Sequence, residues 1–431
     1  MNITRRNFLG SSAAVFAAAA LQNHRAYSAN EKLGVCVMGL HGRGGSHLQA
    51  YAKSEHSDLL AICDADENIL NNVGDQLDSK LPHKVKRYVD VKDVLADASI
   101  DILSIATPNH WHTLASIWAM EAGKDVYVEK PATHDFWEGK QIIAAAKKYG
   151  KIVQHGTQSR SSNQWQRDIP LIRSGEIIGK IHTARCLGFK TGDNRDSIGF
   201  ADDQEAPKHL HWRLWQGPAP EKPYNPNYHP YQWHWFWHYG NGEIGNQGVH
   251  QMDIGCWGMD KGLPSKIYSA GGRYTYEDQG ETHNTNTALL TYADGTMLVF
   301  DVRNRYTNNE DGVGVGNLFY GDTGYYVQGK GFFDKKNQPI VLPEGKHPLP
   351  PDQDCFENFL AAVKSRNEAE IHGNMEQAHL ACSHMHLANI SYRLGRSLDF
   401  DTATEKFVNA PDADAMLRRE YAPGFEVPEL A

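Results

Sequence analysis

The chain has 431 residues, of which 40% are hydrophobic and 22% charged, and its formal net charge at pH 7 is −9. This composition is typical of a globular protein, and the length predicts two domains. The acidic balance, with no basic cluster beyond the first residues, argues against a nucleic-acid-binding surface. Six scattered cysteines without a CxxC pair favour small buried thiols.

The chain begins with the leader-like segment MNITRRNFLGSSAAVFAAAALQ. Arg5 and Arg6 precede an alanine-rich run that is too short and too weakly apolar for a membrane span. A twin arginine before such a run resembles a Tat export signal, which carries folded proteins. We therefore expect residues 1–30 to be a signal peptide. The mature protein is expected to be periplasmic or otherwise exported, without a stable membrane anchor.

Strands and helices alternate after the leader. The expected strands lie at residues 34–38, 58–64, 101–105, 125–131 and 151–158. Helical stretches separate them, and the one over residues 135–150 is closed by Gly150. This alternation predicts a doubly wound parallel sheet in a Rossmann domain over residues 31–156.

The pattern changes in the second half of the chain. β-rich segments joined by long loops lie at residues 180–189, 265–276, 285–304 and 317–328. The sequence ADGT at residues 293–296 is a hairpin turn signal. Residues 375–396 have helical spacing. We therefore expect residues 157–431 to form an α+β domain with an antiparallel sheet, a C-terminal helix and a tail.

A glycine-rich turn follows the first predicted strand. It consists of Gly39, Leu40, His41, Gly42, Arg43 and Gly44. It matches the GxGxxG dinucleotide-binding turn except at His41, whose Cβ is expected to crowd the pyrophosphate. Asp64 ends the next strand, twenty residues after Gly44, where an acid that binds the adenosine ribose belongs. The carboxylate would repel a 2′-phosphate, so the predicted cofactor is NAD; the alternative is an ordinary turn with a solvated acid.

Further motifs follow in a fixed order along the chain. They are ATPNHWH at 106–112, EKP at 129–131, WRLWQGPAP at 212–220, PYNPNYHP at 223–230, GEIGNQGVHQMD at 242–253 and RREYAPGFEVP at 418–428. In this order they resemble the Gfo/Idh/MocA oxidoreductases, and in particular an exported, Tat-leader branch. The resemblance implies a Rossmann domain followed by a large, mainly antiparallel open sheet. It also implies a homo-oligomer, either a dimer or a tetramer.

The resemblance also implies which residues bind the cofactor. Thr107, Pro108, Asn109 and His112 would line the nicotinamide and its ribose. Glu129 would contact the cofactor, and Lys130 would lie under the nicotinamide beside the reacting carbon. The Lys130–Pro131 bond is cis in many members of the family.

Oxidation of an alcohol requires the removal of a hydride and a proton. His250 is expected to be the acid/base residue, and the Lys130 ammonium to stabilise the developing alkoxide. Asp253 would hold the site together or contact the substrate. In many relatives an aspartate stands four residues before the histidine, but this chain has Asn246, whose amide can orient a hydroxyl without adding charge. His250 would then be more readily neutral, unless Asp253 or Glu243 supplies the charge.

Three tryptophans precede this segment at alternate positions, Trp233, Trp235 and Trp237. Aromatic faces stack on the C–H faces of pyranose rings, so these residues are candidates to bind a carbohydrate together with Asn246 and His250. The alternative is that they pack on one face of an edge strand.

Histidines are clustered twice in the second half. The clusters are His229, His234 and His238, and His372, His379, His384 and His386. No metal site is predicted in the later cluster, because it lacks an i,i+4 pair with a completing carboxylate. The earlier cluster could bind substrate or, less readily, a metal.

These observations predict an exported NAD-dependent oxidoreductase that acts on a sugar, polyol or glycoside. Because the periplasm offers no free NAD pool, the cofactor is expected to be tightly bound and restored within the site. Restoration could come from reduction of a second sugar, from an outside acceptor, or from a redox-neutral glycosidase cycle of oxidation, elimination, hydration and reduction. The rival is a non-catalytic sugar-binding protein, against which Lys130 and His250 argue.

Overall fold

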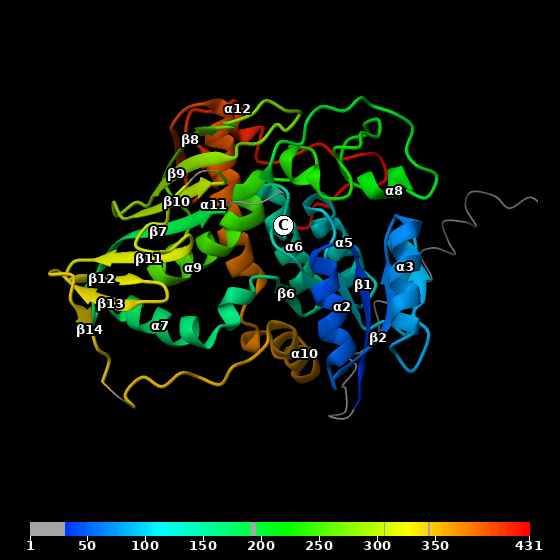
Figure 1. Ribbon diagram of the computed structural model, residues 1–431, viewed down its shortest axis with the longest axis horizontal. Helices are drawn as coiled ribbons and strands as arrows, with labels where there is room; N and C mark the ends of the chain where they lie inside the picture. Colours follow the sequence, from blue (N-terminus) through cyan, green and yellow to red (C-terminus); the bar gives the residue numbers. More distant parts are fainter. Residues whose placement is uncertain (1–30, 191–194, 306, 344) are drawn as a thin grey trace, which may run out of the picture.

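The computed structural model describes residues 31–190, 195–305, 307–343 and 345–431. The predicted export signal lies outside these residues. Two sheets form the two halves of the molecule, a parallel sheet on the right of Figure 1 and a larger sheet on the left. The candidate site lies where these halves meet.

The first sheet confirms the predicted Rossmann arrangement. Its strands are β1 (Leu33–Met38), β2 (Ser57–Cys63), β3 (Lys86–Tyr88), β4 (Ile102–Ile105), β5 (Asp125–Val128) and β6 (Val153–His155). They are parallel and ordered β3-β2-β1-β4-β5-β6. The strands β1, β4, β5 and β6 are buried along their whole length, as expected for a parallel sheet covered by helices on both faces.

Helices connect these strands. They are α2 (Arg43–Lys53), α3 (Glu67–Asp78), α4 (Val91–Ala96), α5 (Asn109–Glu121) and α6 (Phe136–Tyr149). The side chain of Asp66 caps α3 by accepting from the Asn68 N–H. Gly150 ends α6 in the left-handed conformation with φ 60°, as predicted. The strand-to-helix turns therefore gather at the carboxyl edge of the sheet, where ligands of doubly wound folds bind.

The second sheet has ten strands and confirms the predicted, mainly antiparallel architecture. The strands are β7 (Ile181–Phe189), β8 (Lys266–Gly272), β9 (Thr285–Thr291), β10 (Met297–Arg303), β11 (Val315–Gly321), β12 (Gly324–Val327), β13 (Gly331–Asp334), β14 (Pro339–Ile340), β15 (Leu398–Asp401) and β16 (Lys406–Phe407). Their order is β14-β13-β12-β11-β7-β10-β9-β8-β15-β16, and β7 and β10 run parallel. The predicted hairpin joins β9 and β10, where the Tyr292 N–H donates to the Thr296 carbonyl at 2.9 Å.

Helices cover one face of this sheet. They are α7 (Asn163–Ser174), α9 (Val249–Met259) and the long α11 (Met375–Leu394). Residues from these helices share one apolar core with the buried positions of β7, β9 and β10. In Figure 1, α11 runs between the two halves, and it packs against both α6 and α9. The remaining short helices are α8 (Trp212–Gln216) and α12 (Pro411–Asp414).

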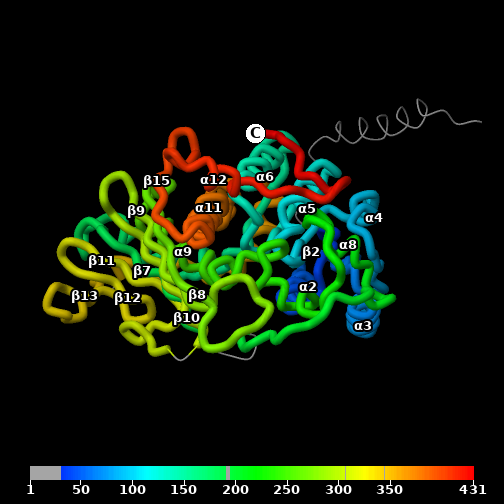
Figure 2. The backbone as a smooth tube through the Cα atoms, turned by 90° about the horizontal axis from the view of Figure 1, so that it is seen from above, coloured from blue at the N-terminus to red at the C-terminus, as the bar shows by residue number. Residues whose placement is uncertain are grey.

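Two late segments return to the Rossmann half. The helix α10 (Cys355–Ser365) joins the apolar core of β1 and β2, and its Phe356 ring stacks on Tyr127 with centroids 4.6 Å apart. The C-terminal tail runs along α5 and α6 (Figure 2), where Phe425 packs on Trp111. The sequence did not reveal this return, because neither segment has a pattern that identifies its packing partner.

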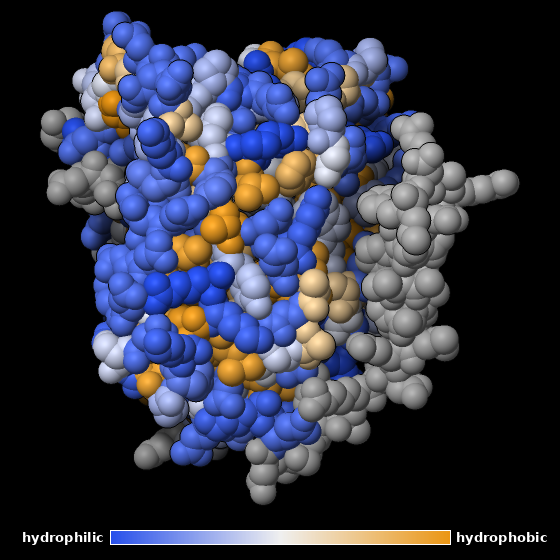
Figure 3. All heavy atoms as spheres, turned by 90° about the vertical axis from the view of Figure 1, so that its right-hand side faces the viewer, coloured by the Kyte–Doolittle hydropathy of each residue, from blue (hydrophilic) through white to orange (hydrophobic). Residues whose placement is uncertain are grey.

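No described helix has the length and apolar character needed to cross a membrane. On the face that lies at the right of Figure 1, most surface residues are hydrophilic and the apolar ones form small patches between them (Figure 3).

Candidate active site

A cavity with a volume of about 410 Å³ lies between the two halves and holds most of the predicted site residues. The carboxyl ends of β1, β2, β4 and β5 form one wall, and a loop after α8 and the start of α9 contribute to the other. The predicted residues that line it are Gly39, His41, Gly42, Arg43, Asp64, Thr107, Pro108, Asn109, His112, Glu129, Lys130, Trp233, Asn246 and His250. Most of the predicted site residues therefore line one cavity, although they come from segments far apart in the chain.

The glycine-rich turn requires its glycines at two positions. Gly39 has φ 88°, and a Cβ there would lie 2.6 Å from the Ala106 carbonyl carbon. A Cβ on Gly44 would lie 2.0 Å from the Gly39 carbonyl oxygen, so Gly44 lets the turn close without lining the cavity. His41, at the second glycine position of the motif, is exposed and reaches the cavity edge.

Asp64 ends β2 and supports the same turn. Its carboxylate accepts from the Leu40 N–H at 2.9 Å and from the Asp66 N–H at 3.0 Å. Burial raises the pKa of Asp64, and these two backbone hydrogen bonds oppose the rise. The carboxylate therefore lies between the turn and the cavity, where a ribose diol can reach it.

Two of the predicted nicotinamide residues already have partners. Both ring nitrogens of His112 lie against carbonyl oxygens, those of Pro131 at 2.6 Å and Thr107 at 2.7 Å. The Asn109 amide donates to Asn241 Oδ1 at 3.0 Å. The Thr107 hydroxyl is buried and has no hydrogen-bond partner in the part of the chain that the structure describes. Among the described residues, His112 is thus held by the protein itself, whereas the buried Thr107 hydroxyl has no protein partner.

Glu129 lies at the centre of a buried charge cluster. It accepts from Arg43 Nε at 2.7 Å, and His47 Nε2 lies 3.2 Å from the same oxygen. Burial alone would raise the pKa of Glu129, but the His47 hydrogen bond and the Arg43 charge hold it well below its usual range. The cluster fixes the end of β5 next to Lys130, and the Lys130–Pro131 peptide bond is cis.

Lys130 faces the opposite wall. Its Nζ donates to Asn246 Oδ1 at 3.4 Å, and the Asn246 amide donates to Glu243 Oε2 at 3.1 Å. Glu243 is fully buried and paired with Arg195 at 2.7 Å. Burial lowers the pKa of Lys130, while Glu129 and Glu243 oppose that shift. Of the two carboxylates weighed from the sequence, Glu243 is therefore the one in contact with Asn246.

His250 lies on the same wall. Its side chain is buried, and Nδ1 has no hydrogen-bond partner among the described residues. Burial, and then the charge of Lys130, lower the pKa of His250 to about 3. The imidazole is therefore neutral near pH 7, which is the form that can accept a proton.

The backbone around His250 is helical, despite the glycines of residues 242–248. Residues Ile244–Gly248 form a π-helical turn that runs directly into α9, and His250 is the second residue of α9. Gly248 packs tightly, since a Cβ there would lie 2.7 Å from the Phe300 ring. Helical geometry explains why Glu243 and Asn246, three residues apart, are neighbours.

Asp253 does not line the cavity. It is one turn after His250 on α9, and both its oxygens accept from Arg160 Nε, at 2.9 and 2.7 Å. Both side chains are at least 96% buried. Of the two roles expected for Asp253, this geometry supports holding the helix in place.

The prediction for the tryptophans is largely wrong. Trp233 and Trp235 lie in a 3₁₀ helix at Gln232–Trp235 and not on an edge strand. Trp233 lines the cavity and stacks on His234, with ring centroids 3.5 Å apart. Trp235 shares a buried aromatic cluster with Trp233 but does not line the cavity, and Trp237 lines a different cavity together with His238 and Arg393. The three rings therefore do not form one wall.

The histidine clusters also separate in space. In the later one, His384 contacts Tyr292, and His386 contacts Thr133 at 2.9 Å. In the earlier one, His229 does not lie with His234 and His238 but beside His41 and Asp66 of the Rossmann half. These contacts join residues more than 90 positions apart, so spacing could not predict them.

The residues at the carboxyl edge of the first sheet fit a bound dinucleotide. The Gly39–Gly44 turn leaves the start of α2 open to a pyrophosphate, and Asp64 can meet a ribose. The unpartnered Thr107 hydroxyl lies farther along the same edge, toward Lys130.

Two family models match the chain. "Oxidoreductase family, NAD-binding Rossmann fold" matches residues 33–157, and "Oxidoreductase family, C-terminal alpha/beta domain" matches residues 180–426. A glycosyl hydrolase family 109 protein from Shewanella baltica is 30% identical over 175 residues, which cover 35% of this chain and 38% of that protein. The chain therefore spans little more than a third of the length of this relative.

Solved structures share the fold across most of the chain. The WlbA dehydrogenase from Bordetella pertussis, in complex with NADH and UDP-GlcNAcA, has a TM-score of 0.64 and 18% identity, covering 86% of this chain and 99% of that one. An aldose–aldose oxidoreductase from Caulobacter crescentus, complexed with glycerol, has a TM-score of 0.61 and 19% identity, covering 86% and 100%. The family models, the cavity and the fold agree: the chain belongs to the Gfo/Idh/MocA oxidoreductase family, with an NAD-binding Rossmann domain.

Proposed function

We propose that this chain is an exported oxidoreductase that uses tightly bound NAD to oxidise a hydroxyl of a sugar, polyol or glycoside. The observation that carries the proposal is the meeting of Lys130, Asn246 and His250 on one cavity, beside the dinucleotide-binding edge of the first sheet. An ammonium and a neutral imidazole at one place are the two groups that removal of a hydroxyl proton requires.

The proposed roles follow from the contacts. When bound, NAD supplies a nicotinamide ring that takes up the hydride from the substrate carbon. The neutral imidazole of His250, which lines the cavity, accepts the hydroxyl proton. Lys130 Nζ stabilises the developing negative charge on the substrate oxygen. Glu243, acting through the Asn246 amide, orients the lysine without placing a carboxylate against it.

The substrate class rests on the second wall. Trp215, Tyr231 and Trp233 line the cavity beside the polar groups of Asn246 and Gln247. Aromatic rings and amides together suit a cyclic polyol, whose two faces are apolar and whose edge carries hydroxyls. The relatives named above, crystallised with a nucleotide sugar acid or with glycerol, support the same class.

A redox-neutral glycosidase is the second candidate function. The local similarity to glycosyl hydrolase family 109 proteins favours it. In that cycle, oxidation of a ring hydroxyl acidifies the adjacent C–H, the aglycone leaves, water adds, and the ketone is reduced again. The cofactor ends as it began, which agrees with a protein that keeps its NAD.

Export and assembly are further parts of the proposal. The twin arginine of the leader supports export, and a folded protein can carry its cofactor through Tat. One face of the ten-stranded sheet presents exposed side chains such as Lys266 and Tyr268, and we propose this face as the contact in a dimer or tetramer.

Mass spectrometry of dinucleotide released from denatured, purified protein tests the proposal, followed by product analysis on a panel of sugars and glycosides. We expect about one NAD per chain, together with a ketone product or a free aglycone. Absorbance of reduced nicotinamide distinguishes an oxidoreductase from a non-catalytic sugar-binding protein, because the binding protein produces no such absorbance. Protein that holds no dinucleotide and changes no substrate would overturn the proposal.

A further inference from the structure

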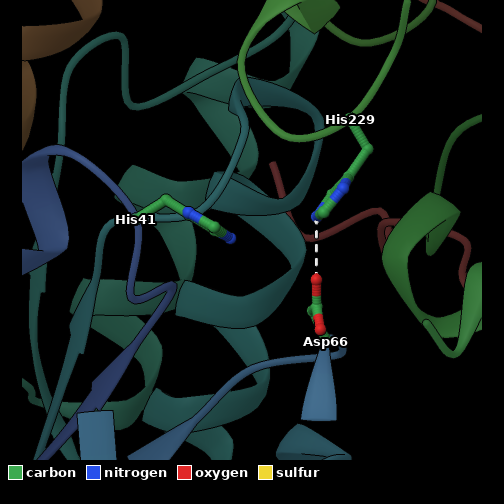
Figure 4. Close-up of side chains that lie close together, drawn as sticks. All are labelled: His41, Asp66 and His229. Atoms are coloured by element: carbon green, nitrogen blue, oxygen red, sulfur yellow. Dashed lines mark ion pairs between the residues drawn. The ribbon is translucent and has the colours of Figure 1, made fainter. Parts of the chain in front are cut away.

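A group of three metal-ligand side chains lies at the edge of the dinucleotide cavity. His41 comes from the β1–α2 turn, Asp66 from the start of α3, and His229 from the loop after α8. Their ligand atoms all lie within 4.8 Å of one another. Figure 4 shows the His41 ring extending toward the gap between His229 and Asp66.

We propose that His41, Asp66 and His229 bind a divalent transition-metal ion of the zinc or cobalt type. Two imidazoles and one carboxylate are the ligand set of open zinc sites, in which further positions are left to water or a ligand oxygen. Because His41 and His229 also line the cavity, those positions are available to an oxygen ligand there.

The separation of Asp66 and His229 suits a bridging ion better than a direct contact. Asp66 Oδ2 lies 3.7 Å from His229 Nε2, which is too long for a hydrogen bond. Zinc bonds of about 2.0–2.2 Å to nitrogen and oxygen can join atoms up to about 4.2 Å apart. One ion therefore fits between these two atoms without a change in their separation.

The carboxylate is already oriented as a ligand. The other oxygen of Asp66 accepts from the Asn68 N–H and faces His209 Nδ1, each at 2.9 Å. This leaves Oδ2 directed at His229. Such outer partners orient metal ligands in established sites and are worth about 10–100-fold in metal affinity.

His41 is the ligand that has to move. Its ring lies edge-on to the His229 ring with centroids 5.6 Å apart. The side chain is exposed and makes no side-chain hydrogen bond within the described ranges, so it is free to turn toward the other two ligands. This role also accounts for a histidine where the dinucleotide motif has a glycine.

Metal binding would tie the Rossmann half to the loop that carries His229. The three ligands belong to segments on both sides of the cavity edge, near Asp64. If NAD binds as proposed above, a metal here closes the adenosine end of the cavity and slows cofactor release. This consequence rests on the proposed function, whereas the metal site itself does not.

The test is titration of the full chain, purified without a histidine tag and stripped with a chelator, with Co²⁺ followed by visible absorption. Metal analysis after equilibration with Zn²⁺ gives the stoichiometry. We expect one ion per chain and cobalt bands typical of nitrogen and oxygen ligands. His41→Ala, which removes an exposed side chain and should fold normally, should weaken binding by at least about 10-fold, and His209→Ala by about 10–100-fold.

His211→Ala is the matched control. His211 lies two residues from His209 and pairs with Glu67 at 2.6 Å, outside the three-ligand group. The His211→Ala variant should leave cobalt affinity unchanged. Absence of stoichiometric binding, or equal affinity in wild type, His41→Ala and His229→Ala, would overturn the metal site. Slower NAD release in the presence of Zn²⁺ supports the cofactor consequence, and cobalt binding without that effect would leave the metal site standing and refute the consequence.

Discussion

The two walls of the cavity hold their functional groups in different ways. On the Rossmann wall, the turn at Gly39–Gly44 is fixed by the backbone at the ends of parallel strands, and Asp64 braces it through two N–H groups. On the opposite wall, Asn246 and His250 are held by helix geometry and by buried charges. The residues that fit the cofactor are therefore held by local backbone, whereas the residues of the proposed proton chemistry are held by tertiary ion pairs.

The largest expected effect is on the proposed catalytic pair, which lies where the two walls meet. Lys130→Met and His250→Ala should each slow the hydride step far more than they weaken NAD binding. Loss of a general base costs about 10²–10⁴-fold, and loss of one electrostatic contact about 10²–10³-fold. Because both act on one proton transfer, the double variant should be only slightly slower than the slower single variant. Stopped-flow measurement of bound-cofactor reduction checks this.

His238→Ala is the control for this pair. His238 lies in the neighbouring cavity with Trp237, so its removal should leave the hydride step unchanged. Fully additive losses in Lys130→Met and His250→Ala would show that the two groups act independently, against the proposed mechanism.

The second effect is a loss of stability and concerns α9, the helix that carries His250 on the opposite wall. Asp253→Ala leaves Arg160 buried without its carboxylate, and we expect the free energy of unfolding to fall by about 3–5 kcal/mol. Urea denaturation measures it. Removal of the exposed partner in the Lys32–Asp58 pair, by Asp58→Ala, should cost less than about 1 kcal/mol. Equal losses in the two variants would mean that Asp253 does not anchor α9.

The third effect is confined to the Rossmann wall. Asp64→Asn keeps the shape of the side chain but removes its charge, and should weaken NAD binding by about 1.5–3 kcal/mol. The preference over NADP should narrow, because repulsion of a 2′-phosphate disappears. Calorimetric titration with both dinucleotides checks the prediction, with Asp75→Asn on the exposed side of α3 as the control. Native protein loaded with NADP would contradict it.

The smallest effect is a change in pH dependence. In the wild type, His250 has a pKa of about 3, so its proton-accepting form persists from neutral to mildly acidic pH. Asn246→Asp adds a negative charge that favours the imidazolium, so the pKa of His250 should rise by roughly one unit. The acidic limb of the rate profile then moves to higher pH. Asn246→Leu, which adds no charge, should not move it upward, and an unmoved limb in Asn246→Asp would place Asn246 outside the proton path.

Sequence alone predicted the Rossmann wall well, since its signals are local. The spacing from Gly44 to Asp64 and the EKP segment identify strand ends, and strand ends of a parallel sheet must meet at one edge. Local patterns also predicted the apolar strands, the hairpin at 293–296 and the helix end at Gly150. These features need no knowledge of distant contacts.

The opposite wall was predicted only in part. The alternation of Trp233, Trp235 and Trp237 suggested a strand, but a 3₁₀ helix at Gln232–Trp235 interrupts it, and Trp233 and Trp237 line different cavities. Glycines disfavour helices, so the sequence around Asn246 did not predict the helical turn that makes Glu243 its neighbour. Partners such as Arg160 for Asp253 arise from tertiary packing, for which the chain carries no spacing signal.

In the proposed reaction, the chain carries its own NAD and uses Lys130 and His250 to oxidise a sugar hydroxyl. Its most direct test is rapid mixing of the purified protein, without added cofactor, with a panel of sugars and glycosides while the absorbance of reduced nicotinamide is recorded. We expect a single-turnover signal of about one equivalent for at least one substrate, and a strongly slowed signal in His250→Ala. NAD-loaded wild-type protein that gives no signal with any substrate, or a His250→Ala variant that reduces its cofactor at the wild-type rate, would contradict it.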